Sequence, residues 1–306
     1  MAKEWCKSRS NEHTIQDLVT AGLLPEKALG VWRSPQGESF PEPQGGEIVV
    51  FEDFIKRGFG IPVHPFLQGL CAYYEIGICN LNPTSILLVS TFIHFCEVYG
   101  GFEPHFDLFR YFFCLRKKGS RGGSKIAGGV YLNLRDGMRA NYLNCPWKAY
   151  ITDWQKKWFY MREEPNSNTL CDIGLIPEKK DSWTEPPQST EQVVQILQWL
   201  PWSRVDGPIV ARNFLGRRVQ PCSKRVHSGY EYSGSQDPTR MRAENMSRRE
   251  LEACVRELFE LSSDKGYVMP RHPVPAFKLM RPPPMVSRLS SEERKILISF
   301  PCVIVM

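Results

Sequence analysis

The stretch Asn82-Pro-Thr-Ser-Ile-Leu-Leu-Val-Ser-Thr-Phe-Ile-His-Phe-Cys-Glu-Val-Tyr99 decides the fold that the sequence predicts. Asn82 is a favoured N-cap residue and Pro83 suits the first helical position, so a helix should begin there. The predicted helix, residues 83–99, is apolar on nearly all sides and should be the central helix of a core. A membrane span needs about 20 predominantly apolar residues, and this stretch includes Ser, Thr, His and Glu, so we expect no membrane segment.

Further helices are predicted on either side of this one. Residues 48–56 carry apolar side chains on one face and end at Gly58, Pro65 opens a second helix, and Pro104 opens one that continues to Phe113. Their short connections favour a compact helical core over residues 47–115. Upstream, a short capped helix begins near residue 14 and stops at residue 22, and the composition of residues 34–46 is typical of a loop.

Strand patterns follow the helices. In residues 130–135 apolar and polar side chains alternate, residues 147–151 alternate again, and residues 158–160 are a β-prone aromatic run. We expect a small antiparallel sheet over about residues 129–161, packed against the helices. The predicted fold class is therefore α+β and mainly α, with isolated helices in a loop-rich C-terminal part.

The chain of 306 residues exceeds the usual size of one domain, and its 24 prolines are unevenly placed. The sequence predicts five parts, with loose ends around an ordered centre. They are an N-terminal extension with a short helix (1–46), the domain core (47–162), a polar linker (163–188), a basic helical region (189–261) and a proline-rich tail (262–306).

The ten cysteines are scattered, and Cys71, Cys79, Cys96 and Cys114 stand inside apolar runs. The first residues are charged and have no apolar run of the kind that a secretion signal needs. Free buried thiols in a reducing compartment are the better interpretation, so we expect an intracellular protein, cytoplasmic or nuclear.

A search for catalytic and metal-binding motifs finds none. No Cys-x-x-Cys pair supplies zinc-knuckle spacing, and His94 and Cys96 point to different faces of a helix. Distant pairs such as His64 with Cys71, or His94 with Glu97, stay open but are more simply core residues. We therefore predict no catalytic residue, no metal, no cofactor and no small-molecule ligand, and not an enzyme.

Phosphate-binding and retroelement-enzyme motifs are missing as well. The glycine-rich run 119–129 matches no nucleotide-binding turn, and with the basic residues from Arg116 to Lys125 it reads as a flexible basic loop. A transposase or nuclease needs carboxylates that converge on two metal ions. The candidates have no distinguishing spacing; they are Asp53, Asp107, Asp136 and Asp153.

The basic residues of the C-terminal half are the remaining candidate site. Residues 204–249 hold ten Lys or Arg against four Asp or Glu, a net charge of +6 that equals the formal charge of the whole chain. Such side chains can neutralise phosphates of RNA or DNA, and Tyr230 and Tyr232 could stack on exposed bases. A solvated face or a nuclear-import signal is the alternative. The candidate nucleic-acid-binding residues are Arg217, Arg218, Lys224, Arg225, Arg240 and Arg242.

Several separated motifs occur in a familiar order. They are residues 46–67, Leu81-Asn82-Pro83, His94-Phe-Cys96-Glu97, Pro104-His105-Phe106-Asp-Leu-Phe-Arg110, Lys156-Lys-Trp158-Phe159-Tyr160, Phe214-Leu-Gly-Arg217-Arg218 and Asp237-Pro238-Thr239-Arg240. Over roughly residues 14–242 the chain resembles the gypsy-type transposon domain family of plant long-terminal-repeat retroelement proteins.

The resemblance implies a retrotransposon origin and transfers no functional residue, because no activity is established for the family. Together with the missing enzyme motifs and the local charge of +6, it favours a structural or assembly protein, comparable in role to a capsid protein, that contacts RNA or DNA and self-associates. Two alternatives stay open: a divergent transposase or nuclease, and a decayed or domesticated protein-interaction module.

Overall fold

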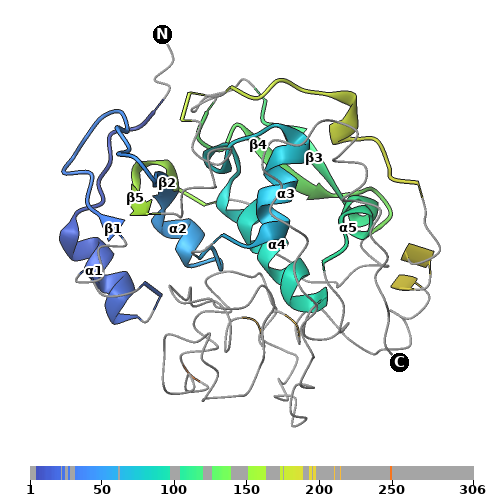
Figure 1. The fold of residues 1–306 in the computed structure, drawn as a ribbon, viewed down its shortest axis with the longest axis horizontal. Helices are drawn as coiled ribbons and strands as arrows, with labels where there is room; N and C mark the ends of the chain where they lie inside the picture. The colour runs from blue at the N-terminus through green and yellow to red at the C-terminus, as the bar shows by residue number, and fades with distance from the viewer. Residues whose placement is uncertain are drawn as a thin grey trace.

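The computed structural model describes residues 5–21, 23–24, 27, 32–60, 63–96, 104–119, 126–138, 151–162, 173–174, 176–188, 193–194, 196–197, 210, 214 and 249. The fold is α+β, as predicted, with two small antiparallel sheets among the helices (Figure 1). One group of elements is built on the three-stranded sheet β1-β5-β2, and beside it helices α3, α4 and α5 pack with the two-stranded sheet β3–β4.

Local signals placed three helices correctly. Helix α3 (Pro65–Tyr74) begins with proline at its first position, and His64 caps it by accepting a hydrogen bond from the Phe66 backbone at 3.1 Å. Helix α4 (Pro83–His94) is capped by Asn82, whose side chain accepts from the Ser85 backbone at 2.8 Å. Helix α1 (Glu12–Thr20) starts earlier than predicted, because Asn11 is its N-cap. Residues 97–99, the end of the predicted central helix, lie outside the described residues.

The prediction of a helix over residues 48–56 is wrong in its first half. Glu47–Phe51 is strand β2, and only Glu52–Ile55 is helical, as α2. The run Ile48-Val49-Val50 is β-branched, which favours an extended chain, and all five strand residues are buried. A short apolar run cannot be assigned by periodicity alone when its strand partner lies far along the chain.

That partner is β5 (Trp158–Arg162), which pairs in register from Glu47↔Arg162 to Phe51↔Trp158. The other edge of β5 takes β1 (Trp32–Arg33), so β5 is the central strand. The predicted sheet over residues 129–161 therefore exists in a different form. Its strands at 130–134 and 158–162 belong to two different sheets, and residues 147–150 lie outside the described residues.

The second sheet joins β3 (Phe113–Lys117) to β4 (Val130–Leu134). Helix α5 (Phe106–Phe112) ends where β3 begins, so Phe113, which we expected to be helical, starts a strand instead. Arg116 and Lys117 are likewise strand residues and not part of a loop. One face of this sheet is apolar and buried, with Leu115, Val130 and Leu132 turned into the core.

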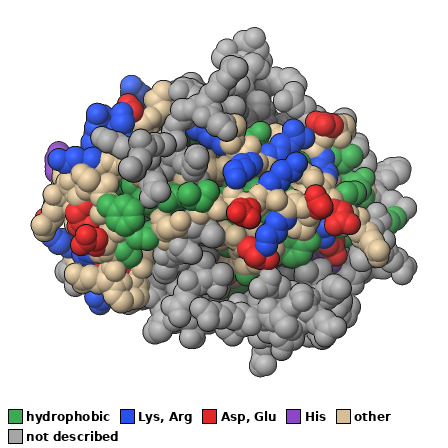
Figure 2. All heavy atoms as spheres, turned by 90° about the horizontal axis from the view of Figure 1, so that it is seen from above, with side chains coloured by type: hydrophobic (Ala, Val, Ile, Leu, Met, Phe, Trp, Pro, Cys, Tyr) green, Lys and Arg blue, Asp and Glu red, His purple; other side chains and the backbone are tan. Residues whose placement is uncertain are grey.

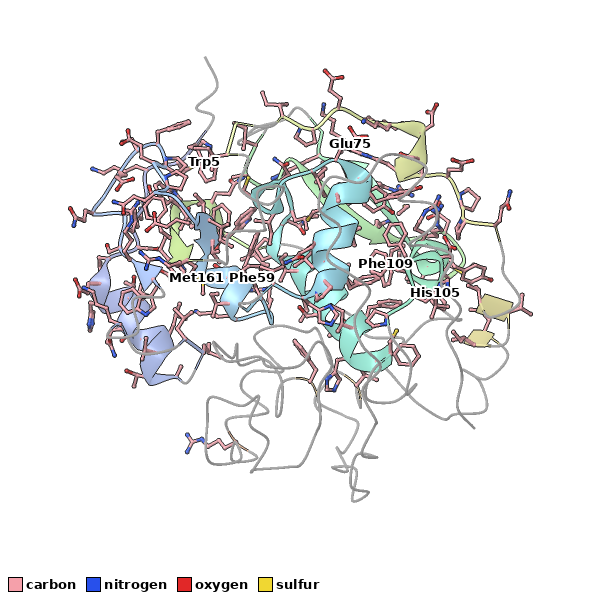
Figure 3. All side chains as sticks on the ribbon, in the orientation of Figure 1. Trp5, Phe59, Glu75, His105, Phe109 and Met161 are labelled. Carbon is pink, nitrogen blue, oxygen red and sulfur yellow. The ribbon has the colours of Figure 1, made fainter. Side chains whose placement is uncertain are left out.

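An aromatic cluster fills the space between the helices and can be followed from Phe109 in Figure 3. The Phe109 ring lies 5.0 Å from Phe92 of α4, 5.5 Å from Phe66 of α3 and 4.7 Å from Phe113. Such pairs stabilise a core beyond the area that they bury. The thiols predicted from the sequence to be free and buried are so: Cys71, Cys79 and Cys96 belong to the core, and Cys114 is buried in the strand β3.

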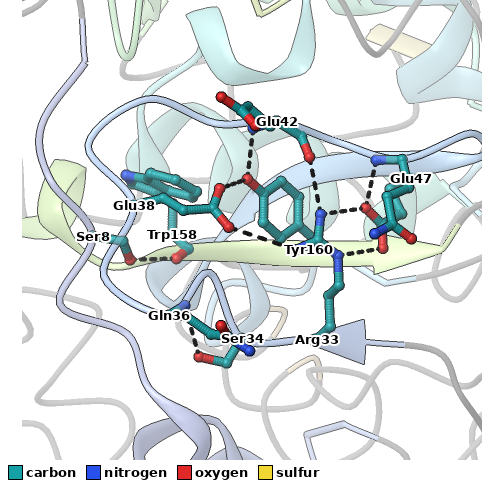
Figure 4. Close-up of polar contacts among 10 residues, drawn as sticks. Ser8, Arg33, Ser34, Gln36, Glu38, Glu42, Glu47, Trp158 and Tyr160 are labelled. Atoms are coloured by element: carbon teal, nitrogen blue, oxygen red, sulfur yellow. Dashed lines mark hydrogen bonds and ion pairs between the residues drawn. The ribbon is translucent and has the colours of Figure 1, made fainter.

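The compact part begins before Glu47. Trp5 is buried and stacks on Phe51 at a centroid distance of 6.1 Å, and the Trp158 indole donates a 2.8 Å hydrogen bond to the Cys6 carbonyl. The loop over residues 34–46 is held by Arg33, whose guanidinium lies 3.6 Å from the Tyr160 ring centroid (Figure 4). The same guanidinium donates two hydrogen bonds to Glu47, at 2.7 and 2.8 Å, in the bidentate geometry that makes such pairs strong.

Two glycines give a matched test of this packing. Gly128 has a φ of +70°, and a Cβ there would lie 2.5 Å from the Trp154 ring, which is itself wedged against Phe51. Gly128→Ala should lower the free energy of unfolding by about 2 kcal/mol or more. Gly69→Ala, inside α3 with open space around it, should raise that free energy by about 0.5–1 kcal/mol. Urea unfolding measures both, and equal effects would contradict the described turn at Gly128.

Candidate nucleic-acid interface

The six basic residues predicted to bind nucleic acid, Arg217, Arg218, Lys224, Arg225, Arg240 and Arg242, lie outside the described residues. So do Tyr230, Tyr232 and most of residues 204–249. The proposal that this segment contacts RNA or DNA therefore stays a prediction.

The four aspartates considered for a metal-dependent reaction each lie beside a basic side chain. The nearest nitrogen–oxygen distances are 2.7 Å for Asp53 with Arg57, 3.5 Å for Asp107 with Arg110, 3.8 Å for Asp136 with Arg116 and 2.5 Å for Asp153 with Lys156. Over the described ranges, no three His, Cys, Asp or Glu side chains come together as a metal-binding group. These carboxylates serve separate ion pairs.

Two residue pairs were open as catalytic candidates, His64 with Cys71 and His94 with Glu97. Their described members lie in surroundings typical of capping and core residues. His64 is engaged as the N-cap of α3, and burial raises the pKa of the Cys71 thiol far above its usual range, which leaves the sulfur a poor nucleophile. His94 is buried with its ring 5.5 Å from the Phe214 ring, while Glu97 lies outside the described residues. None of the helices in the described part of the chain has the length and apolarity of a membrane span.

A hollow of about 410 Å³ opens beside the sheet β3–β4. Side chains alternate across a strand, so the face opposite the buried Leu115 and Leu132 presents Arg116 and Tyr131. These two residues are cross-strand partners and therefore neighbours on that face. The polar and charged residues that line the hollow are Arg116, Lys117, Tyr131, Arg135, Asp136, Lys179 and Thr184.

One wall of the hollow comes from residues 176–188, which we expected to be a linker. Trp183, in a short 3₁₀ helix at Asp181–Trp183, is buried and donates a 3.2 Å hydrogen bond to the Tyr74 carbonyl. Arg135 donates to the carbonyls of Thr184 at 2.7 Å and Glu185 at 2.9 Å. A third bond, of 2.6 Å, joins Arg135 Nε to the Arg110 carbonyl. Arg135 thus fixes the wall to the sheet, and its donors are used on the protein itself.

The other cations of the hollow are accessible. Lys117 and Lys179 are exposed, and the Arg116 side chain is 41% exposed. A hydrogen bond with Cys114 raises the pKa of Arg116, so this guanidinium keeps its charge throughout the physiological range. Asp136, the single carboxylate in the lining, is 99% exposed and lies 3.8 Å from Arg116. An ion pair this exposed contributes little, so an incoming anion can replace Asp136 at small cost.

Figure 2 shows the face of the molecule that lies at the top of Figure 1, where β3, β4 and residues 176–188 are found. Lys and Arg side chains gather there, with Asp and Glu side chains among them. Positive and negative side chains are therefore mixed on this face. The sequence indicated the basic run from Arg116 but placed it in a loop. It gave no signal that Lys179 would lie beside Tyr131.

The fold and the hollow define an α+β protein with a cationic surface site. Residues 48–117 match the family model described as "putative gypsy type transposon". This confirms the resemblance seen in the sequence over residues 48–117 and supports a retrotransposon derivation, while the rest of the predicted range, residues 14–242, lies outside the match. The matched residues run from β2 to the end of β3 and include Arg116 and Lys117. No curated protein matches the chain, and no solved structure does.

The wall of the hollow depends on one large side chain. Trp183→Ala should lower the free energy of unfolding by about 3–5 kcal/mol, because it leaves a cavity and frees the Tyr74 carbonyl. Trp183→Phe keeps most of the volume and loses the hydrogen bond, so it should cost about 1 kcal/mol. Urea unfolding, with limited proteolysis of residues 176–188, measures both effects. A Trp183→Ala protein as stable and as protease-resistant as the wild type would show that this segment is not anchored.

Proposed function

We propose that the protein is a non-enzymatic assembly protein of a retrotransposon, comparable in role to a capsid protein, that binds nucleic acid through its phosphates. The observation that carries the proposal is the hollow beside β3–β4, whose lining includes Arg116, Lys117 and Lys179 and a single carboxylate, the exposed Asp136. The match over residues 48–117 supplies the retroelement context. The net charge of +6 in residues 204–249 supplies a second basic region of the same kind.

The chemistry of the hollow suits phosphate groups. Lysine and arginine bind phosphate oxygens through charge-assisted hydrogen bonds, and each contact releases counterions from the nucleic acid. Binding of this kind tolerates different sequences, which is what packaging of a whole transcript requires. Self-association would let many weak contacts act together, since linked sites raise the effective concentration of each other's ligand.

A transposase or nuclease is the alternative that would need a cluster of carboxylates. Across the described ranges, Asp53, Asp107, Asp136 and Asp153 occupy separate ion pairs, so no observation favours that chemistry over the assembly role. Likewise, no observation on the described residues favours a decayed or domesticated interaction module over the assembly role. The assembly role is the one that the cationic hollow supports.

The salt dependence of RNA binding tests the proposal. Fluorescence anisotropy of a labelled single-stranded RNA, titrated with the full-length protein over a salt series, should show steeply salt-dependent binding. Changing Arg116, Lys117 and Lys179 to alanine should weaken binding and lower the slope of log K against log salt by about 2, since each phosphate contact contributes about 0.7. Alanine at Arg217, Arg218, Lys224 and Arg225 should weaken binding as well.

A matched control removes the same charge elsewhere. Lys7, Arg9 and Lys156 lie near the three-stranded sheet and outside the lining of the hollow, and their joint replacement by alanine should leave the slope unchanged. An equal loss of binding in the control variant would mean that net charge alone attracts RNA. Absence of binding at low salt in the wild-type protein would contradict the proposed function.

A further inference from the structure

We infer that the hollow binds single-stranded nucleic acid, with Tyr131 as the surface on which one unpaired base stacks. This inference rests on the proposed function and names its ligand class. Tyr131 is the one aromatic residue in the lining of the hollow. It lies directly across the two strands from Arg116, so an aromatic ring and a phosphate-binding cation share one face of the sheet.

The Tyr131 ring differs from the other tyrosine rings nearby. Tyr73 and Tyr74 pack edge to face at 5.1 Å, Tyr111 packs on Phe112 at 5.3 Å, and Tyr160 packs on Trp158 at 5.7 Å. Within the described part of the chain, no such aromatic partner lies against Tyr131, which is half-buried at the edge of the hollow. Its ring thus lies in the lining of the hollow, whereas the other rings pack against aromatic side chains.

The dimensions and the lining of the hollow suit a nucleotide of a strand. Its volume of about 410 Å³ falls within the range of about 300–1,000 Å³ that is usual for sites holding small organic groups. Cys114 adds apolar lining beside Arg116, while Lys117 and Lys179 bring two further cations to the hollow. An aromatic ring and surrounding cations together fit a base with its sugar and flanking phosphates.

The arrangement favours a single strand over a duplex. In a duplex each base is stacked between its neighbours, so its face is not accessible to a tyrosine. Proteins that bind single strands combine cations along the backbone with aromatic rings under the bases, and such stacking accepts any base. A duplex could use the cations of the hollow and would leave the Tyr131 ring without a role.

Base stacking can be distinguished from phosphate binding by comparing two strands of equal charge, one with bases and one without. We would compare a labelled single-stranded RNA with an abasic strand of the same length and with the matching duplex, by anisotropy on the full-length protein. The wild-type protein should bind the base-bearing strand at least about fivefold more tightly than the abasic strand, the lower limit for one base stacked on an aromatic ring. Tyr131→Ala should remove that preference, and Tyr131→Phe should retain it.

A second measurement needs no variant. RNA containing 4-thiouridine, cross-linked to the wild-type protein by light, should label the tryptic peptide 126–135, which carries Tyr131. Thermal unfolding of each variant shows whether Tyr131→Ala is folded. If that variant is not folded, the cross-link to the wild-type protein tests the inference instead.

The outcomes separate this inference from the proposed function. Suppose alanine at Arg116, Lys117 and Lys179 weakens binding while the protein binds abasic and base-bearing strands equally and no cross-link forms on residues 126–135. Phosphate binding then stands and the role of Tyr131 is overturned. The role of Tyr131 would also be overturned if the protein bound the duplex, or a free mononucleotide, more tightly than the single strand. If the protein binds no strand at any salt concentration, the proposed function fails and this inference fails with it.

Discussion

The antiparallel pairing of β2 with β5 joins residues 47–51 to residues 158–162, and most of the remaining structure is attached to it. All of β2 and all but the last residue of β5 are buried, so this ladder is inside the protein. Trp5 packs on Phe51 and Trp158, the pair at one end of the ladder. Strand β1 pairs with the other edge of β5. Residues 5–10 and the 34–46 loop pack on this surface.

The same pairing closes a long loop that contains α3, α4, α5 and the sheet β3–β4. Closing a loop costs entropy that grows only slowly with its length, so one buried ladder can hold an insertion of this size. Within it, Asn80 donates to the Ile126 carbonyl at 3.1 Å and Ser85 accepts from the Leu132 backbone at 2.8 Å. The Ser85 bond fixes β4 on α4, and so it also fixes which face of the sheet carries Tyr131.

Elements that depend on signals within a few residues could be predicted from the sequence. Asn82-Pro83 and Pro65 start helices by local capping, and the alternation in residues 130–134 reveals a strand. Strands β2 and β3 were missed because their partners lie far away or because no turn residue separates β3 from α5. For the site, the basic run from Arg116 was visible in the sequence. Its position opposite Tyr131 and next to Lys179 depends on pairing and on the burial of Trp183, which no local pattern encodes.

The cations around the hollow divide into two kinds, and the division suits a ligand of variable sequence. Arg135 donates hydrogen bonds to three backbone carbonyls and so gives the hollow a rigid wall. Lys117 and Lys179 keep long, exposed side chains whose ammonium groups can follow phosphates in several positions. The fixed wall and the tyrosine ring on an adjoining face determine where a base can enter. The long lysine side chains can contact phosphates along more than one path of the nucleic-acid backbone. We propose that a site built in this way selects for an unpaired strand and not for a particular base.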